Sequence, residues 1–232
     1  VKLCRKVNIS YGKGPLQKLD VYFIKDRKKL NPIHIFIHGG YWRSLDKKYH
    51  SHMAKPFLEN NVIFFNINYD LLPKVNLSRI RDEIIEAIVW IYRNSIKFNG
   101  NNRNIVISGH SAGAHLVSLM LGIDWTKYNL PHYAFKGAAL ISGIYDVEIV
   151  CKLDLNEEIK LSREEAKQNT TINKFPIVKF PLLFACGKKE PIEWRQQTII
   201  YHNLLKKFNF NVKLLSNLNE NHFSLIDAMA KN

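Results

Sequence analysis

The feature that most constrains this chain is a turn motif in residues 105–116. Three β-branched residues lead into Gly109–Gly113, a Gly-x-Ser-x-Gly motif with Ser111 at its centre, and a helical pattern follows. This strand–turn–helix context is that of a nucleophile elbow. The turn strains the serine backbone, and its flanking glycines leave room where β-carbons would collide with facing backbone. The motif therefore predicts Ser111 as a nucleophile at the carboxyl end of a strand.

Apolar runs that alternate with helical patterns indicate the rest of the fold. Strands are expected at 18–24, 33–37, 62–68, 105–108, 136–142, 180–186 and 211–215, and helices at 53–59, 78–98, 112–121, 193–208 and 222–229. We expect a turn at Asn31–Pro32, and we expect Ser78 to cap the longest helix. This order predicts an α/β fold, a mostly parallel sheet with helices on both faces. Ligands of such sheets bind beyond the carboxyl ends of the strands.

Length and composition indicate one globular domain over residues 1–232. Apolar residues make up 46% of the chain and charged residues 23%, which is ordinary for a folded protein. An irregular, charged insertion is expected at about 147–180, with a helical portion near 162–167 and a lid-like position. The sequence contains no internal repeat and no low-complexity segment.

The net charge of +14 raises the question of an acidic partner. The lysines are spread along the chain, so we expect binding to neither nucleic acid nor membrane, although the field could steer an anionic or zwitterionic substrate. Three separated cysteines indicate reduced thiols rather than a disulfide framework, which favours a cytoplasmic protein. Three Asn-x-Ser/Thr sequons are attributed to the asparagine-rich composition. No apolar run reaches about 18 residues.

A nucleophilic serine needs a base and an orienting acid. His222 follows the last expected strand and precedes the last helix, which agrees with the hydrolase chain order of Ser, acid and His. The loop after the strand at 180–186 offers Glu190 and Glu193 as the acid. Glu190 lies in the loop itself, whereas Glu193 would suit the first turn of the next helix. We favour Glu190 and leave Glu193 as the alternative.

The developing oxyanion needs amide donors. The amide of Ala112, directly after the nucleophile, is one candidate, and the Gly-Gly turn after the strand at 33–37 supplies Gly40 and Tyr41 as the others. Trp42, Tyr69 and Tyr145 also follow strand ends on this side, which suggests substrate binding in a site for a flat ring. No metal-ligand constellation and no phosphate loop is recognised, so neither a metal nor a cofactor is expected.

Several of these segments together resemble one enzyme branch. They are His-Gly-Gly-Tyr-Trp at 38–42, Asn-Tyr-Asp-Leu-Leu-Pro at 68–73, Gly-His-Ser-Ala-Gly-Ala-His-Leu at 109–116, Ser-Gly-Ile-Tyr-Asp at 142–146 and Asn-His-Phe at 221–223, with Leu-Asp-Val-Tyr at 19–22. They are similar to the kynurenine formamidase (arylformamidase) branch of the α/β-hydrolases, from about residue 10 to the end. The tryptophan after His-Gly-Gly-Tyr, combined with Ala-His-Leu after the elbow, is more specific than either alone.

The resemblance implies a cofactor-free serine hydrolase that converts N-formyl-L-kynurenine to L-kynurenine and formate in tryptophan catabolism. By position Ser111 matches the family nucleophile and His222 its base. Glu190 falls where the family usually has aspartate, with Trp194 and Gln197 at the expected offsets behind it. A small-molecule aryl carboxylesterase is the alternative reaction, and an inactive hydrolase-fold binding protein is the alternative class. A homodimer is the one protein partner considered.

Overall fold

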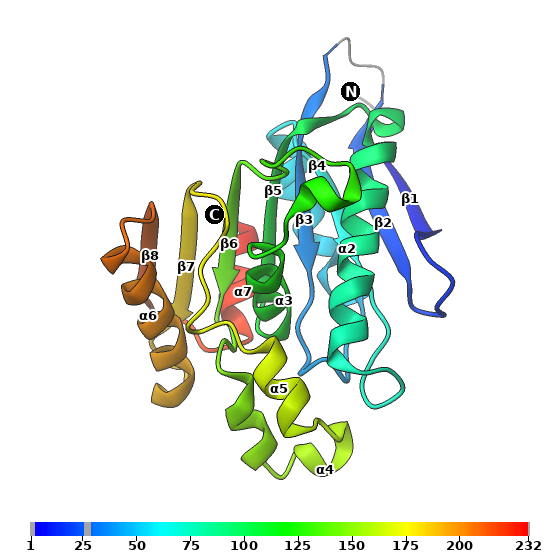
Figure 1. Ribbon diagram of the computed structural model, residues 1–232. Coiled ribbons are helices and arrows are strands. Elements are labelled where there is room, and N and C mark those ends of the chain that lie inside the picture. The colour runs from blue at the N-terminus through cyan, green and yellow to red at the C-terminus, as the bar shows by residue number, and fades with distance from the viewer. Residues whose placement is uncertain (1–2, 26–28, 232) are drawn as a thin grey trace.

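A central twisted sheet organises the computed structural model, which describes residues 3–25 and 29–231 (Figure 1). Its strands are β1 (Leu3–Ser10), β2 (Lys18–Ile24), β3 (Asn31–Ile37), β4 (Ile63–Ile67), β5 (Gly100–His110), β6 (Gly137–Ile141), β7 (Leu182–Gly187) and β8 (Val212–Leu218). They lie in the order β1-β2-β4-β3-β5-β6-β7-β8. β2 pairs antiparallel with β1 and β4, and the pairs from β4 to β8 are parallel. The predicted fold class is confirmed.

Helices cover both faces of this sheet. They are α1 (Ala54–Glu59), α2 (Leu77–Asn94), α3 (Ala112–Met120), α4 (Asn156–Ile159), α5 (Arg163–Asn169), α6 (Ile192–Lys207) and α7 (Ser224–Lys231), with short 3-10 helices η1 (Lys47–Met53), η2 (Ser95–Phe98), η3 (Trp125–Tyr128) and η4 (Val147–Lys152). In Figure 1, α2, α3 and α6 lie before the sheet and α7 lies behind it. None of these helices in the described chain is long and apolar enough to cross a membrane.

Each face of the sheet has its own core, because successive strand residues point to opposite sides. Ile35 of β3 joins the larger cluster with Ile84 of α2, while its neighbour Phe36 joins the smaller cluster with Leu58 of α1 and Ile226 of α7. All of these side chains are almost completely removed from water. The central strands are therefore buried on both faces, which explains their continuous apolar runs.

Three local expectations differ from the structure. Asn31 and Pro32 begin β3 instead of forming a turn, since Asn31 pairs with Gly100 of β5. Asn76 rather than Ser78 caps α2, its side chain accepting a hydrogen bond from the Arg79 amide. β1 was not predicted, because it is an edge strand whose side chains are mostly exposed and so lack the alternation of a half-buried strand.

The parallel strands end together at the lower edge of the sheet in Figure 1, where α4 and α5 of the insertion also lie. The parallel strands β3 to β8 lead here into the loops that carry the predicted site residues, with His222 in the loop after β8. Parallel pairing keeps these ends at the same level, for example Ile37 beside Gly109 and Ile141 beside Ala185. Residues that are more than 180 positions apart in the sequence therefore meet at one edge.

Candidate active site

Ser111 lies in the turn between β5 and α3 with φ 57° and ψ −121°, a backbone conformation that is strained for a residue with a side chain. The flanking glycines are required by the packing. A β-carbon on Gly109 would lie 2.3 Å from the Gly113 carbonyl oxygen, and one on Gly113 would lie 2.1 Å from the Ile37 oxygen. The turn is further held by the Ser111 amide, which donates to the Ile141 oxygen over 2.8 Å.

His222 and Glu190 form a buried pair beside this turn. His222 Nδ1 lies 2.9 Å from Glu190 Oε2. The other carboxylate oxygen accepts hydrogen bonds from Ser142 Oγ over 2.6 Å and from the Gly187 amide. Burial alone would raise the pKa of Glu190, but the hydrogen bonds from His222, Ser142 and Gly187 outweigh it and hold the pKa below its ordinary value. Glu190 is therefore ionised at neutral pH and can orient the imidazole.

The carboxylate that meets His222 is thus that of Glu190 and not that of Glu193, the alternative left open by the sequence. Glu193 lies in the exposed first turn of α6. Glu190 lies in the loop after β7, where its carboxylate accepts a hydrogen bond from the amide of Gly187 at the strand end. The extra methylene of glutamate is accommodated there without loss of the histidine contact.

His110 holds the backbone of His222 in place, a role that was not predicted from the sequence. Its Nε2–H donates to the His222 carbonyl oxygen over 2.9 Å, and the two rings lie 4.6 Å apart. Burial lowers the pKa of His110 to about 3, so its ring is neutral at pH 7. The residue directly before Ser111 therefore fixes the backbone of His222. In the sequence, the position of His110 directly before Ser111 was the only feature that could have indicated this supporting role.

The turn after β3 supplies free amide donors. Gly40, Tyr41 and Trp42 all have positive φ, at 107°, 50° and 57°. A β-carbon on Gly40 would lie 2.2 Å from the Ser44 oxygen, so glycine is required there. Within the described chain, the hydrogen bonds leave the amides of Gly40, Tyr41 and Ala112 without an acceptor. Such donors can stabilise an anion that forms beside Ser111.

Ser111, His222, Gly40 and Tyr41 line one cavity of about 230 Å³. Its remaining wall includes Trp194 and apolar residues near the entrance. Phe223 is the most exposed of these, at 75%. The cavity thus brings together a serine, an oriented imidazole and free amides, the components that acyl transfer through a covalent intermediate requires. No group of three His, Cys, Asp or Glu side chains suited to a metal occurs among residues 3–25 and 29–231.

Comparison with known proteins agrees with this geometry. Residues 19–218 match the family model described as BD-FAE. The kynurenine formamidase of Salmo salar is 31% identical over 96% of this chain and 76% of its own length. The chain belongs to the BD-FAE family and to the kynurenine formamidase branch of the α/β-hydrolases.

Other similar proteins are more distant. The isoprenylcysteine alpha-carbonyl methylesterase of Arabidopsis thaliana is 28% identical over 52% of this chain and 28% of its own length. Among solved structures, an esterase of Pyrobaculum calidifontis superposes with a TM-score of 0.79 at 16% identity, covering 99% of this chain and 83% of that one. This last likeness concerns the fold alone.

The predicted substrate-binding aromatics of this BD-FAE family member are not in the cavity wall. Trp42, Tyr69 and Tyr145 are each completely buried. The Trp42 indole donates to His115 Nδ1 over 3.2 Å, the Tyr69 hydroxyl donates to the His38 oxygen over 2.9 Å, and Tyr145 packs in the core. These aromatics support the turns from behind, because the strand ends direct them inward. The structure therefore gives all three a supporting position instead of the predicted place in the cavity wall.

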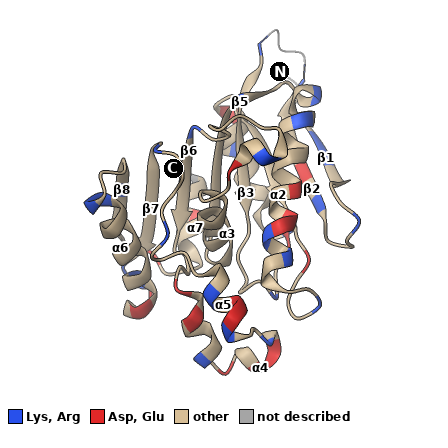
Figure 2. Ribbon diagram, viewed as in Figure 1, with Lys and Arg blue, Asp and Glu red and all other residues tan. Residues whose placement is uncertain are grey.

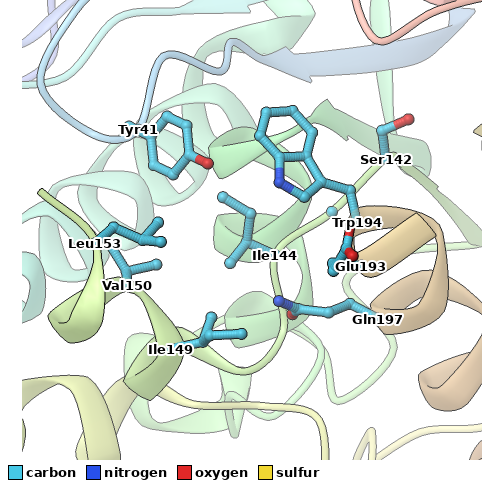
Figure 3. Close-up of a pocket in the computed structure, with 10 residues that line it drawn as sticks. Tyr41, Ser142, Ile144, Ile149, Val150, Leu153, Glu193, Trp194 and Gln197 are labelled. Carbon is cyan, nitrogen blue, oxygen red and sulfur yellow. The ribbon is translucent and has the colours of Figure 1, made fainter. Parts of the chain in front are cut away.

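Trp194 and Tyr41 provide the aromatic surface instead. The Trp194 ring meets the His222 ring edge-on at 4.5 Å and the Tyr41 ring edge-on at 6.0 Å. Both residues also line a second cavity of about 240 Å³, shown in Figure 3. Trp194 comes four residues after Glu190 at the start of a helix on the catalytic edge, a position that could have indicated its role.

Proposed function

We propose that this protein hydrolyses N-formyl-L-kynurenine to L-kynurenine and formate, a step of tryptophan catabolism, by a Ser111–His222–Glu190 triad without a cofactor. The supporting observation is the 2.9 Å pair of His222 and Glu190 at a cavity that Ser111 also lines. The relationship to kynurenine formamidases supports the choice of substrate. The aromatic pair of Tyr41 and Trp194 at this cavity is compatible with an aryl formamide.

In the first half-reaction, Ser111 Oγ attacks the formyl carbon while His222 Nε2 accepts the hydroxyl proton. Glu190 holds the other ring nitrogen and stabilises the imidazolium. The amides of Gly40, Tyr41 and Ala112 donate to the oxygen on which negative charge develops. The carbon–nitrogen bond then breaks, and the aryl amine leaves with the proton from His222, so Ser111 carries the formyl group as an ester.

In the second half-reaction, water attacks the formyl ester. His222 takes one proton from the water, and the same amides stabilise the second oxyanion. The Ser111 carbon–oxygen bond breaks, Ser111 recovers its proton from His222, and formate is released. The balance is one water consumed for each formamide cleaved. An aryl amine departs more readily than an alkyl amine, so this site needs no stronger acid than an imidazolium.

The direct test is formate release from N-formyl-L-kynurenine by the purified protein, with Ser111→Ala as the control. Loss of the nucleophile of a triad lowers turnover by about a millionfold in a well-adapted enzyme. A fluorophosphonate probe would label the unmodified protein and leave Ser111→Ala unlabelled. Formate release that survives the substitution would contradict the mechanism, and absence of both release and labelling would favour an inactive binding protein.

A general aryl carboxylesterase is the second candidate, because relatives of this chain include a methylesterase. The chemistry at Ser111 would be the same, with an alcohol as the leaving group in place of an amine. The ratio of kcat/KM for N-formyl-L-kynurenine to that for p-nitrophenyl acetate separates the two. The formamidase proposal predicts a ratio above one, and a strong preference for the ester would exclude it.

A further inference from the structure

The second cavity contains groups that the proposed reaction does not use. It adjoins the reactive cavity, and Tyr41 and Trp194 line both. In Figure 3 these two rings stand side by side at one end of the second cavity. A molecule whose reactive carbonyl lies at Ser111 therefore has a neighbouring space of about 240 Å³ into which the rest of it can extend.

The wall opposite α6 is apolar and comes from the loop after β6 and from the start of the insertion. Ile144, Val150 and Leu153 form most of it, and Val150 is buried. Leu153 and its neighbour Ile149 at the rim are 42% and 40% exposed. An aromatic or methylene group seated here would remove these side chains from water at a favourable free energy.

Glu193 places a negative charge at the edge of this apolar space. Within the described part of the chain its carboxylate forms neither a hydrogen bond nor an ion pair. Acidic side chains also gather on α4 and α5 nearby, as Figure 2 shows. Over the whole insertion, residues 147–180, acidic and basic side chains are equal in number, six of each. The unpaired Glu193 carboxylate is therefore the charge that favours a cationic group at the edge of this cavity.

We propose that the second cavity is the subsite for the side arm of the leaving amine, with Glu193 binding its protonated α-amino group. The inference rests on the proposed function. Because the acyl part of a formamide is a single CHO unit, nearly all of the substrate beyond the scissile bond belongs to the amine. The arm then packs against Ile144 and Leu153, and its ammonium meets the Glu193 carboxylate. The substrate class is an aryl formamide with a zwitterionic amino-acid arm, and the ammonium of that arm is the group that Glu193 binds.

The charge is tested with Glu193→Gln on three compounds: N-formyl-L-kynurenine, N-(2-acetylphenyl)formamide, which lacks the amino-acid group, and p-nitrophenyl acetate. The expected result is a loss of about fivefold in kcat/KM for N-formyl-L-kynurenine, through KM, the upper range for an ion pair at a water-exposed edge. The other two substrates change by less than about twofold. The matched control Glu157→Gln, which removes a charge from the same edge outside the cavity, leaves all three unchanged.

The space is tested with Leu153→Trp, which fills the cavity from its half-exposed rim and so does not disturb the core. We expect a loss of about tenfold in kcat/KM for N-formyl-L-kynurenine, the discrimination that one ill-fitting group produces in an apolar pocket. Turnover of p-nitrophenyl acetate is retained. Leu30→Trp, a substitution at an exposed leucine outside both cavities, is the matched control.

The outcomes separate the two proposals. If the unmodified protein cleaves p-nitrophenyl acetate but neither formamide, both the proposed function and the subsite are wrong. If it cleaves both formamides while Glu193→Gln slows them equally or not at all, only the assignment of the ammonium site is overturned. If Leu153→Trp leaves N-formyl-L-kynurenine unaffected, the arm does not occupy this cavity.

Discussion

The elbow around Ser111 and the insertion at 147–180 lie at the same edge of the sheet but are built differently. In the elbow, a single added β-carbon on Gly109 or Gly113 would collide with backbone. In the insertion, side chains such as Ile149 of η4 and Leu153 directly after it remain about half exposed. The elbow therefore tolerates almost no change, whereas the insertion can vary its side chains. This contrast agrees with the proposal that the elbow performs the reaction while the insertion contributes to substrate selection.

The two regions are nevertheless joined by buried hydrogen bonds. His115 of α3 contacts the Asn169 carbonyl oxygen at 2.8 Å through Nε2, and Ser118 Oγ lies 2.7 Å from Thr171 Oγ1. At the surface, Arg43 forms an ion pair with Glu158 of α4. Substitutions at the triad beside the elbow, at the buried hydrogen bonds and at the surface of the insertion should thus have effects of decreasing size.

After Ser111→Ala, the largest effect is expected for Glu190→Gln, which keeps the side-chain shape but can present an amide N–H to His222. The imidazole would then favour the wrong tautomer, and turnover should fall by about ten-thousandfold. Glu190→Asp keeps the charge and should retain much more activity. Steady-state kinetics on p-nitrophenyl acetate measures both variants, and equal activities for the two would contradict the orienting role of the carboxylate.

A large effect on stability is expected at the joint, for His115→Ala. The substitution leaves the Trp42 indole N–H and the Asn169 carbonyl without their partner and opens a buried space, for a loss of about 3 kcal/mol in the free energy of unfolding. Urea unfolding measures it. The smaller change Ser118→Ala should cost less, since the Thr171 hydroxyl that it frees can rotate toward another acceptor. An unaltered midpoint for His115→Ala would mean that the regions are not coupled.

Acid should destabilise the region around the elbow, because burial lowers the pKa of His34 and His110 to about 3 and of His50 and His115 to about 4. Unfolded histidine titrates near 6.5, so between pH 6.5 and about 4 the unfolded chain binds more protons than the folded one. The free energy of unfolding is therefore expected to be highest above pH 6.5 and to fall as the pH drops through this window.

Urea midpoints from pH 8 to pH 5 test this dependence. His50 has two buried ring nitrogens without partners among the described residues and lies against Phe36, so His50→Phe should flatten the slope. The insertion at 147–180 contains no histidine and should contribute nothing to it. A midpoint that stays constant across this range would show that the four rings are hydrated.

The smallest effect is expected for Glu158→Gln in the insertion. Its ion pair with Arg43 is exposed, with 36% of the arginine side chain and 62% of the glutamate side chain accessible to water. Such pairs contribute less than about 1 kcal/mol. We expect a change below about 0.5 kcal/mol in urea unfolding, reduced further at high salt. A larger loss would make the insertion a structural rather than a variable region.

The central elements were predictable from the sequence, but details that depend on distant contacts were not. Periodicity and the elbow glycines predict the strand that leads into Ser111, the apolar face of α2 and the order of the elements. β1 escaped prediction because it lies at the edge, where most of its side chains face water. Trp42 was misplaced because a position after a strand end does not reveal whether a side chain turns inward or outward.

What the sequence determined by itself is the elbow turn, since the Gly-x-Ser-x-Gly motif between an apolar strand pattern and a helical pattern specifies Gly109–Gly113 and the candidate nucleophile Ser111. The choice between Glu190 and Glu193 as the partner of His222 was decided only by the tertiary structure. The tertiary structure alone also decided the support of His222 by His110 and the second cavity beside Tyr41 and Trp194. These features join residues far apart in the chain, and their positions depend on how the strands align and how the insertion packs.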